Sequence, residues 1–236
     1  MAEVLSSKIM EENIAHIRLR IAQAAKASGR LPQEIFLCAA SKSRTSQTIK
    51  ESAMHQVDMF GENRMQEMVA NFDAGAYLGK PCHFIGHLQT NKVKKIVGLA
   101  DVIQSVDSLR LLEVIDREAS VQNLCQDILF QVNLGDEPGK DGASKKDLWQ
   151  MLEAAAGLRN VRVKGLMAIP PVTDNITESR WYFAMLRELL ERAKTYRYEN
   201  APMDTLSMGM TDSFEAAILE GATIIRVGTG IYGPRQ

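Results

Sequence analysis

The feature that most constrains the fold is a regular alternation of short apolar runs with longer helix-like stretches along almost the whole chain. Eight alternating strand–helix units indicate a parallel sheet, and eight is also the number of strands that closes a parallel barrel. The apolar runs of strand length lie near residues 35–40, 57–60, 82–85, 101–106, 127–133, 161–168, 203–206 and 222–227.

Helical periodicity fills the segments between these runs. The expected helices lie near residues 46–55, 62–73, 89–98, 108–122, 145–156, 178–197 and 211–220. A further amphipathic helix is expected over residues 3–29, before the first strand, and Gly29 closes it. Its apolar positions are Ile9, Ile14, Ile17, Ile21 and Ala24.

A doubly wound open sheet is the competing architecture. Its usual dinucleotide-binding signature, GxGxxG after the first strand, is absent, and Ser41-Lys42-Ser43-Arg44 stands there instead. No linker rich in Pro, Gly or Ser divides the 236 residues. We therefore favour one domain over residues 1–236, a single α/β chain folded as a (β/α)8 TIM barrel with an extra N-terminal helix.

Composition excludes several classes of protein. The net charge is -1 at pH 7, which favours neither nucleic acid nor an anionic membrane surface as a partner. The three cysteines are scattered through apolar runs and form no pattern of metal-ligand spacing, so we expect buried free thiols and no metal site. The absence of a signal-peptide pattern and of a long apolar stretch predicts a cytoplasmic protein without membrane contact.

In a parallel barrel, ligands meet the loops that follow the strands, and Lys42 follows the first strand. An ordinary lysine is protonated, but desolvation or a nearby cation lowers its pKa and frees the amine to attack a carbonyl. Arg226, at the end of the eighth run, is the candidate cation. The competing interpretation is a solvated loop lysine.

The last two strands end in residues that suit a phosphate group. Ser207-Met208-Gly209 follows one, and Gly228-Thr229-Gly230 follows the other. Such glycines let backbone N–H groups approach an anion, hydroxyls add donors, and Ser213 or Asp212 is expected to cap the next helix. The competing interpretation is that the glycines only make tight turns. A reactive lysine together with a phosphate site suggests pyridoxal phosphate.

Arg226 alternates with Ile225 and Val227, so it should point away from the face that they share and into the barrel mouth. An arginine facing a pyridine nitrogen would keep that nitrogen unprotonated, which weakens the cofactor as an electron sink. The alternative is an ordinary ion pair with Glu220 or Glu215.

Four other residues could serve a ligand at the barrel mouth. Asn63 could orient a ring hydroxyl and Glu62 could hold a lysine or arginine, or both could cap the following helix. His87 could face the ligand, although a structural role is the more common one for a histidine in such a turn. Met167 is expected to pack at a pocket wall.

Nine short blocks, in order along nearly the whole chain, carry a specific family resemblance. They are Ser41-Lys42, Phe60-Gly61-Glu62-Asn63, Phe84-Ile85-Gly86-His87-Leu88-Gln89-Thr90-Asn91-Lys92, Ser105-Val106-Asp107, Gln131-Val132-Asn133, Gly165-Leu166-Met167-Ala168-Ile169-Pro170, Leu206-Ser207-Met208-Gly209-Met210, Glu215-Ala216-Ala217-Ile218 and Arg226-Val227-Gly228-Thr229. With these blocks the chain closely resembles the pyridoxal phosphate homeostasis proteins.

The resemblance implies a barrel of pyridoxal phosphate fold type III, similar to the N-terminal domain of alanine racemase. It implies Lys42 as the lysine that holds the cofactor as an internal aldimine. It also implies the remaining cofactor contacts, which are phosphate contacts from Ser207, Gly209, Gly228 and Thr229, Arg226 near the pyridine nitrogen, and Asn63 and Met167 near the ring.

The family resemblance implies a carrier or regulator of vitamin B6 supply, with effects on amino- and keto-acid balance and without robust catalysis or established catalytic residues. Partners would be the cofactor itself and pyridoxal phosphate-dependent apoenzymes. Two departures from the family pattern are Arg64, where a tyrosine is common, and Gly142-Ala143, where a glycine and an aliphatic residue are usual. Neither removes a proposed cofactor contact.

Two other functions compete with this one. A weak amino-acid racemase of this fold would need a second domain, which supplies a tyrosine base in the dimer. Since the chain ends soon after Val227, we expect no such domain and a monomer. An aldolase-like barrel would use a lysine Schiff base without a cofactor, and it would be colourless where a bound cofactor is yellow.

Overall fold

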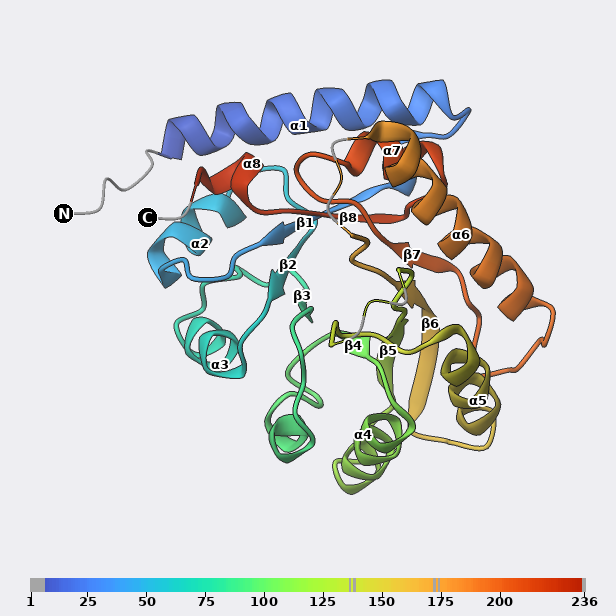
Figure 1. Ribbon diagram of the computed structural model, residues 1–236. Helices are drawn as coiled ribbons and strands as arrows, with labels where there is room; N and C mark the ends of the chain where they lie inside the picture. Colours follow the sequence, from blue (N-terminus) through green and yellow to red (C-terminus); the bar gives the residue numbers. More distant parts are fainter. Residues whose placement is uncertain (1–6, 136, 138, 172, 174, 235–236) are drawn as a thin grey trace.

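The strands form a closed barrel in which each strand runs parallel to its neighbours in chain order and β8 pairs back with β1 (Figure 1). This computed structural model describes residues 7–135, 137, 139–171, 173 and 175–234. Closure confirms the predicted barrel over the open sheet. The strands are β1 (Phe36–Ala40), β2 (Met59–Glu62), β3 (Cys82–Phe84), β4 (Val102–Val106), β5 (Gln126–Gln131), β6 (Val161–Met167), β7 (Thr205–Ser207) and β8 (Ile224–Val227).

Helical segments follow the strands and surround the barrel (Figure 1). The segment expected as a helix near 89–98 is instead a 3₁₀ helix, η2, in which the buried Val93 and Ile96 lie three residues apart, as this tighter turn requires. The segments are η1 (Pro32–Glu34), α2 (Ser46–Ala53), α3 (Met65–Asp73), η2 (Thr90–Lys95), α4 (Leu109–Val121), α5 (Lys145–Ala155), α6 (Ile176–Lys194), α7 (Phe214–Leu219) and α8 (Thr229–Tyr232).

The extra N-terminal helix, α1 (Ser7–Ala27), lies across the outside of the barrel against α7, α8 and α2 (Figure 1). Residues 3–6 of the predicted helix lie outside the described residues. Ile14, Ile17 and Ile21 are buried as predicted, but Ile9 is 44% exposed and Met10 is buried in its place, because position 10 continues the same helical face. Gly29 ends the helix with a φ of +70°, as expected of a glycine after a helix.

The apolar core has an outer and an inner part. Ile225 and Val227 of β8 belong to the large cluster between the strands and the helices, whereas Ile224 packs with Cys38 and Met59 in a separate buried cluster. Arg226 shares the side of β8 that Ile224 occupies, because side chains alternate along a strand. The predicted inward direction of Arg226 is therefore confirmed.

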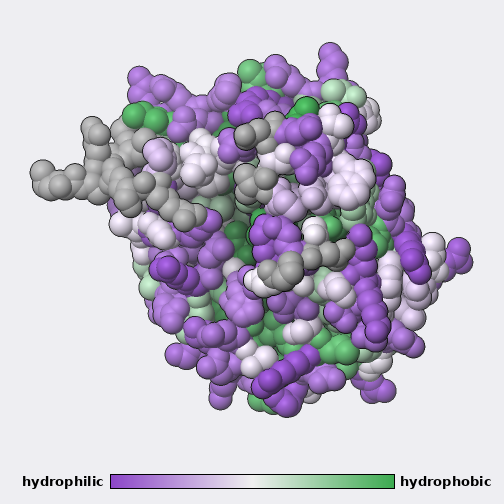
Figure 2. Space-filling model, in the orientation of Figure 1, coloured by the Kyte–Doolittle hydropathy of each residue, from purple (hydrophilic) through white to green (hydrophobic). Residues whose placement is uncertain are grey.

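Hydrophilic residues cover most of the molecular face in Figure 2. Among the described residues, no helix combines the length and the apolar character that crossing a membrane requires.

Candidate functional site

A cavity of about 250 Å³ opens at the carboxyl ends of the strands, and we call it the mouth cavity. It brings together five of the residues that the sequence singled out, from loops far apart in the chain. Its lining residues are Ala40, Lys42, Arg44, Asn63, Ile85, Ile169, Met210, Thr211, Asp212, Arg226, Gly228 and Thr229.

Lys42 stands in a short turn that is held from both sides. The hydroxyl of the buried Ser41 donates to the Glu62 carboxylate at 2.8 Å, and Glu67 Oε2 accepts from the Ser43 N–H at 3.2 Å. Ser43 itself has a φ of +62°, a conformation that costs energy for a residue with a side chain. These contacts fix the backbone on both sides of the half-buried lysine, which lines the cavity.

Glu62 anchors that turn from the end of β2. Its Oε1 accepts from Ser41 and also from Asn71 and Tyr77, at 2.9 and 3.1 Å, while its buried Oε2 has no hydrogen-bond partner among the described residues. Burial raises the pKa of this carboxyl, although the three hydrogen bonds oppose the shift. The expectation that Glu62 holds a lysine or arginine directly is corrected here, since its hydrogen-bond donors are uncharged.

Asn63 lines the cavity immediately after Glu62, and its buried Oδ1 has no hydrogen-bond partner within the described part of the chain. A buried acceptor without a donor is costly, which suits a ligand that brings one. Gly86 makes this position possible, because a Cβ there would collide with the Asn63 carbonyl oxygen. Asn63 does not cap α3, whose N-cap is Arg64, an exposed residue paired with Glu67 at 3.4 Å.

Arg226 is only 4% exposed, yet it makes no ion pair with any carboxylate that the structure describes. Its Nη1 donates to Ser207 Oγ at 2.6 Å and its Nη2 to the Ala168 carbonyl at 2.9 Å. Burial lowers its pKa to about 10, which leaves the guanidinium charged at neutral pH. The alternative pairing is wrong, because Glu215 pairs with Arg20, and Glu220 with Arg180 and Arg187.

The two glycine-containing loops lie together at one side of the mouth cavity. Thr229 Oγ1 donates to Thr211 Oγ1 at 3.0 Å, and the Gly230 N–H donates to the same oxygen at 3.2 Å. Gly228-Thr229-Gly230 is more than a turn, since Thr229 begins the short helix α8. Ser213 is the N-cap residue of α7, as predicted, but its side chain makes no capping hydrogen bond, because its hydroxyl accepts from the Met210 N–H at 3.2 Å.

Three predicted site residues lie outside the lining of the mouth cavity. Met167 is fully buried at the end of β6, and Ser207 is fully buried with its hydroxyl donating to Gln104 Oε1 at 2.6 Å. Gly209 has a φ of +89°, and a Cβ there would lie 2.6 Å from the Ala217 Cβ. Its carbonyl accepts from the Arg226 N–H at 3.0 Å, so Gly209 shapes the loop beside the cavity.

Arg44 is a cavity residue that the sequence reasoning missed. Its Nη2 donates to the Gly233 carbonyl at 2.9 Å, and its guanidinium lies 5.5 Å from the centre of the Tyr232 ring. The signal available was its place two residues after Lys42 in the same loop. Lys42, Arg44 and Arg226 outnumber Asp212, so the lining favours an anionic ligand.

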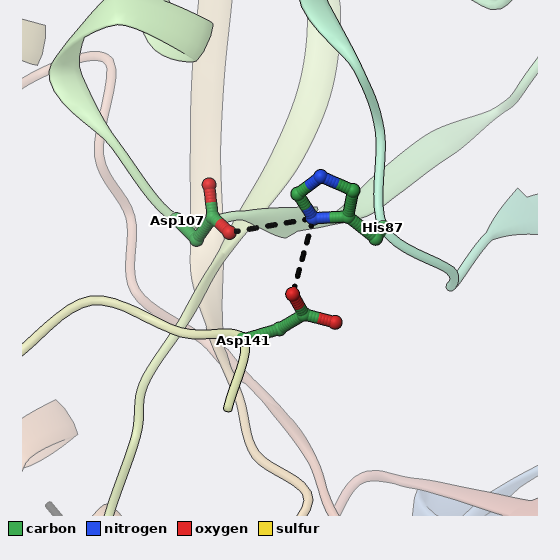
Figure 3. A group of neighbouring side chains, drawn as sticks. All are labelled: His87, Asp107 and Asp141. Atoms are coloured by element: carbon green, nitrogen blue, oxygen red, sulfur yellow. Dashed lines mark ion pairs between the residues drawn. The ribbon is translucent and has the colours of Figure 1, made fainter. Parts of the chain in front are cut away.

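His87 belongs to a different cluster, in the loops after β3, β4 and β5 (Figure 3). Its Nδ1 lies 3.2 Å from Asp141 Oδ1 and 3.8 Å from Asp107 Oδ2. These three ligand-type atoms lie within 4.8 Å of one another, although His87 and Asp141 are exposed. His87 is not part of the mouth-cavity lining.

Comparison with known proteins gives a family match over nearly the whole chain. The family described as "Alanine racemase, N-terminal domain" matches residues 12–236. The pyridoxal phosphate homeostasis protein of Aquifex aeolicus is 40% identical over 225 residues, covering 95% of this chain and 98% of that protein. The protein of the same name from Escherichia coli K12 is 34% identical, covering 95% and 96% of the two chains.

Solved structures agree with the sequence match. PipY of Synechococcus elongatus, with pyridoxal phosphate bound, has a TM-score of 0.80 at 34% identity and covers 90% of this chain and 100% of that one. Alanine racemase of Corynebacterium glutamicum has a TM-score of 0.71 at 14% identity, covering 95% of this chain and 61% of that one. At that identity the second likeness establishes the fold alone.

Proposed function

The chain belongs to the pyridoxal phosphate homeostasis protein family, with the fold of the alanine racemase N-terminal domain, and from this premise we propose that it binds pyridoxal 5'-phosphate in the mouth cavity. Lys42 Nζ holds the cofactor as a Schiff base. The observation that carries the proposal is that Lys42 lines one cavity with the buried Arg226, which pairs with no carboxylate among the described residues. The protein acts in pyridoxal phosphate homeostasis and in amino- and keto-acid balance.

The residues of the mouth cavity fit the cofactor group by group. Asn63 Oδ1, which has no hydrogen-bond partner among the described residues, accepts from the ring hydroxyl, and the buried Met167 packs near the ring. Gly209, Gly228 and Thr229 contribute to the phosphate site, where backbone N–H groups and the Thr229 hydroxyl act as donors. Lys42 and Arg44 add positive charge to the same cavity.

Ser207 contributes to the phosphate site only indirectly. Its hydroxyl hydrogen is directed to Gln104, and its oxygen accepts from Arg226. A direct contact between this hydroxyl and a phosphate would break the bond to Gln104. The Thr229 hydroxyl also donates within the protein, to Thr211, but that bond is exposed whereas the Ser207 bond is buried. We therefore assign the hydroxyl donor of the phosphate site to Thr229 rather than to Ser207.

Arg226 limits the chemistry that the cofactor can support. When bound, pyridoxal phosphate supplies an electron sink for carbanions, and this property is strongest when the ring nitrogen is protonated. Arg226 has only donors to offer and keeps its own proton, so it holds that nitrogen unprotonated. We therefore propose a carrier or regulator of the cofactor that acts as a monomer, delivers to pyridoxal phosphate-dependent apoenzymes and lacks robust catalysis.

Weak amino-acid racemisation is the alternative function, and one experiment separates the two. Purified protein is titrated with pyridoxal phosphate while its visible absorption is followed, and the loaded protein is then assayed for racemisation of amino acids. We expect saturable binding with a yellow band, and turnover that does not exceed that of a Lys42→Ala control. Sustained racemisation that disappears in Lys42→Ala would overturn the non-catalytic assignment. A protein that binds no cofactor would overturn the function as a whole.

A further inference from the structure

A row of four buried polar side chains crosses the inside of the barrel, and we call it the polar chain. It consists of His83 on β3, Gln104 on β4, Ser207 on β7 and Arg226 on β8, none more than 5% exposed. Arg226 Nη1 lies 2.6 Å from Ser207 Oγ, Ser207 Oγ lies 2.6 Å from Gln104 Oε1, and Gln104 Nε2 lies 2.7 Å from His83 Nδ1.

The bond from Arg226 to Ser207 fixes the direction of every other hydrogen bond in the polar chain. A guanidinium only donates, so the Ser207 oxygen accepts from Arg226 and the Ser207 hydroxyl donates to the oxygen of Gln104. The Gln104 amide nitrogen then donates to His83 Nδ1, which must be the unprotonated nitrogen of a neutral imidazole. Burial lowers the pKa of His83 to about 4, against the pull of Asp101 and Asp127, which is consistent with a neutral imidazole.

The polar chain joins the two ends of the barrel. Arg226 lines the mouth cavity, while His83 lines a second cavity of about 360 Å³ at the amino ends of the strands, together with Phe36, Val102 and Ile224. A barrel interior of this size is usually filled by apolar side chains. Four interior positions instead carry polar groups that satisfy one another, and the last of them is a charged group at the candidate cofactor site.

We propose that Gln104 and His83 are positioning residues that, through Ser207, fix the plane and the full positive charge of the Arg226 guanidinium at the mouth cavity. The inference deepens the proposed function, on which its cofactor readout rests. The Ala168 carbonyl fixes a second nitrogen of the guanidinium, so the two bonds define its plane. Ser207, Gln104 and His83 are all neutral and all far weaker bases than Arg226, so the proton and the positive charge stay on the guanidinium.

The first test compares two buried glutamines. Gln104→Met removes the middle of the polar chain, whereas Gln126→Met removes a side chain of β5 that is 3% exposed and donates to the Ala100 carbonyl at 3.0 Å. We expect Gln104→Met to raise the dissociation constant of pyridoxal phosphate about tenfold and to shift the visible absorption maximum. We expect Gln126→Met to change neither. A folded Gln104→Met protein with the wild-type spectrum and affinity would overturn the proposal.

A second test needs neither the cofactor nor a variant. Nitrogen NMR of the cofactor-free protein reports which nitrogen of His83 carries the proton. The polar chain requires a proton on Nε2 and an accepting Nδ1, whereas a proton on Nδ1 would overturn the proposal. A protein that shows the expected His83 tautomer but binds no pyridoxal phosphate would refute the proposed function and leave the polar chain standing, so the two failures are distinguishable.

Discussion

Glu62 Oε1 accepts a hydrogen bond from Ser41 Oγ at 2.8 Å, and this bond joins the ends of β1 and β2. Lys42 follows one partner and Asn63 follows the other, so the bond fixes the relative position of two walls of the mouth cavity. The same oxygen accepts from Asn71 and Tyr77, which ties the junction to α3 and to the loop after it. One buried carboxyl thus organises the side of the cavity that carries the lysine.

Replacement of Glu62 tests this junction. Glu62→Leu removes the acceptor of three buried donors, of which Ser41 Oγ keeps the Gly61 carbonyl at 3.3 Å, and should lower the free energy of unfolding by about 2–3 kcal/mol. Glu62→Gln keeps an acceptor oxygen and should recover most of that loss. Urea unfolding measures both variants, and equal stability of Glu62→Leu and the wild type would contradict the anchoring role.

Arg226 should contribute to stability as well as to cofactor binding. Arg226→Leu leaves the buried Ala168 carbonyl and Ser207 hydroxyl without a donor, so we expect a loss of about 1–3 kcal/mol in unfolding free energy. Arg187→Leu is the matched control, because Arg187 is 43% exposed and Glu220 keeps its partner Arg180. We expect this control to lose less than about 1 kcal/mol. Equal losses of unfolding free energy in the two variants would show that the buried contacts of Arg226 stabilise the fold no more than an exposed ion pair does.

His83 should make the protein sensitive to mild acid. Its folded pKa of about 4 lies below the ordinary histidine pKa of 6.5, so between these values the unfolded chain binds more protons than the native protein. Stability therefore rises with pH across this window and is lost as pH falls from 6.5 towards 4, by up to about 3 kcal/mol.

The comparison that isolates this effect is the wild type against His83→Asn, whose side-chain oxygen can accept from Gln104 but does not titrate. Unfolding free energies measured by urea between pH 4 and pH 7 should show a smaller slope for the variant. Glu62 opposes this effect in both proteins, because its raised pKa makes stability fall as pH rises above 4.5. Subtracting the unfolding free energy of His83→Asn from that of the wild type at each pH cancels the Glu62 contribution. Parallel profiles would mean that His83 is protonated equally in both states.

Lys42 should be important for the cofactor and unimportant for the fold. The side chain is half-buried at the cavity, and hydrogen bonds of Ser41 and Ser43 hold the turn that carries it. Lys42→Ala should therefore abolish the yellow band while changing the unfolding free energy by no more than about 0.5 kcal/mol. Lys50→Ala, at an exposed lysine of α2, serves as the control and should keep the band. A loss of several kcal/mol in Lys42→Ala would indicate a structural lysine.

The barrel could be predicted because its signals are local. Apolar runs and helical periodicity mark the strands and most helices, and the alternation of Ile225, Arg226 and Val227 predicted which of them faces inward. The 3₁₀ helix Thr90–Lys95 was harder to predict, since the apolar spacing of a 3₁₀ helix and that of an α-helix differ little over six residues.

The partners of the site residues could not be read from the sequence. The bonds from Ser41 to Glu62 and from Ser207 to Gln104 and Arg226 connect different strands, and only the closed barrel brings these residues together. Sequence therefore predicted Ser207 as a phosphate contact from its loop-end position, whereas its hydroxyl points into the polar chain. Arg44 was missed for a similar reason, because its place at the cavity depends on its contacts with Gly233 and Tyr232.

The most direct test of the account is the location of the covalent cofactor. Protein loaded with pyridoxal phosphate is reduced with borohydride, digested, and mapped by mass spectrometry. We predict that the peptide containing Lys42 carries the mass of the reduced cofactor in a one-to-one ratio to the protein. No peptide with another lysine should carry it at that ratio. Cofactor mass on a different lysine, or none on any peptide from a yellow, loaded protein, would contradict the assignment of Lys42.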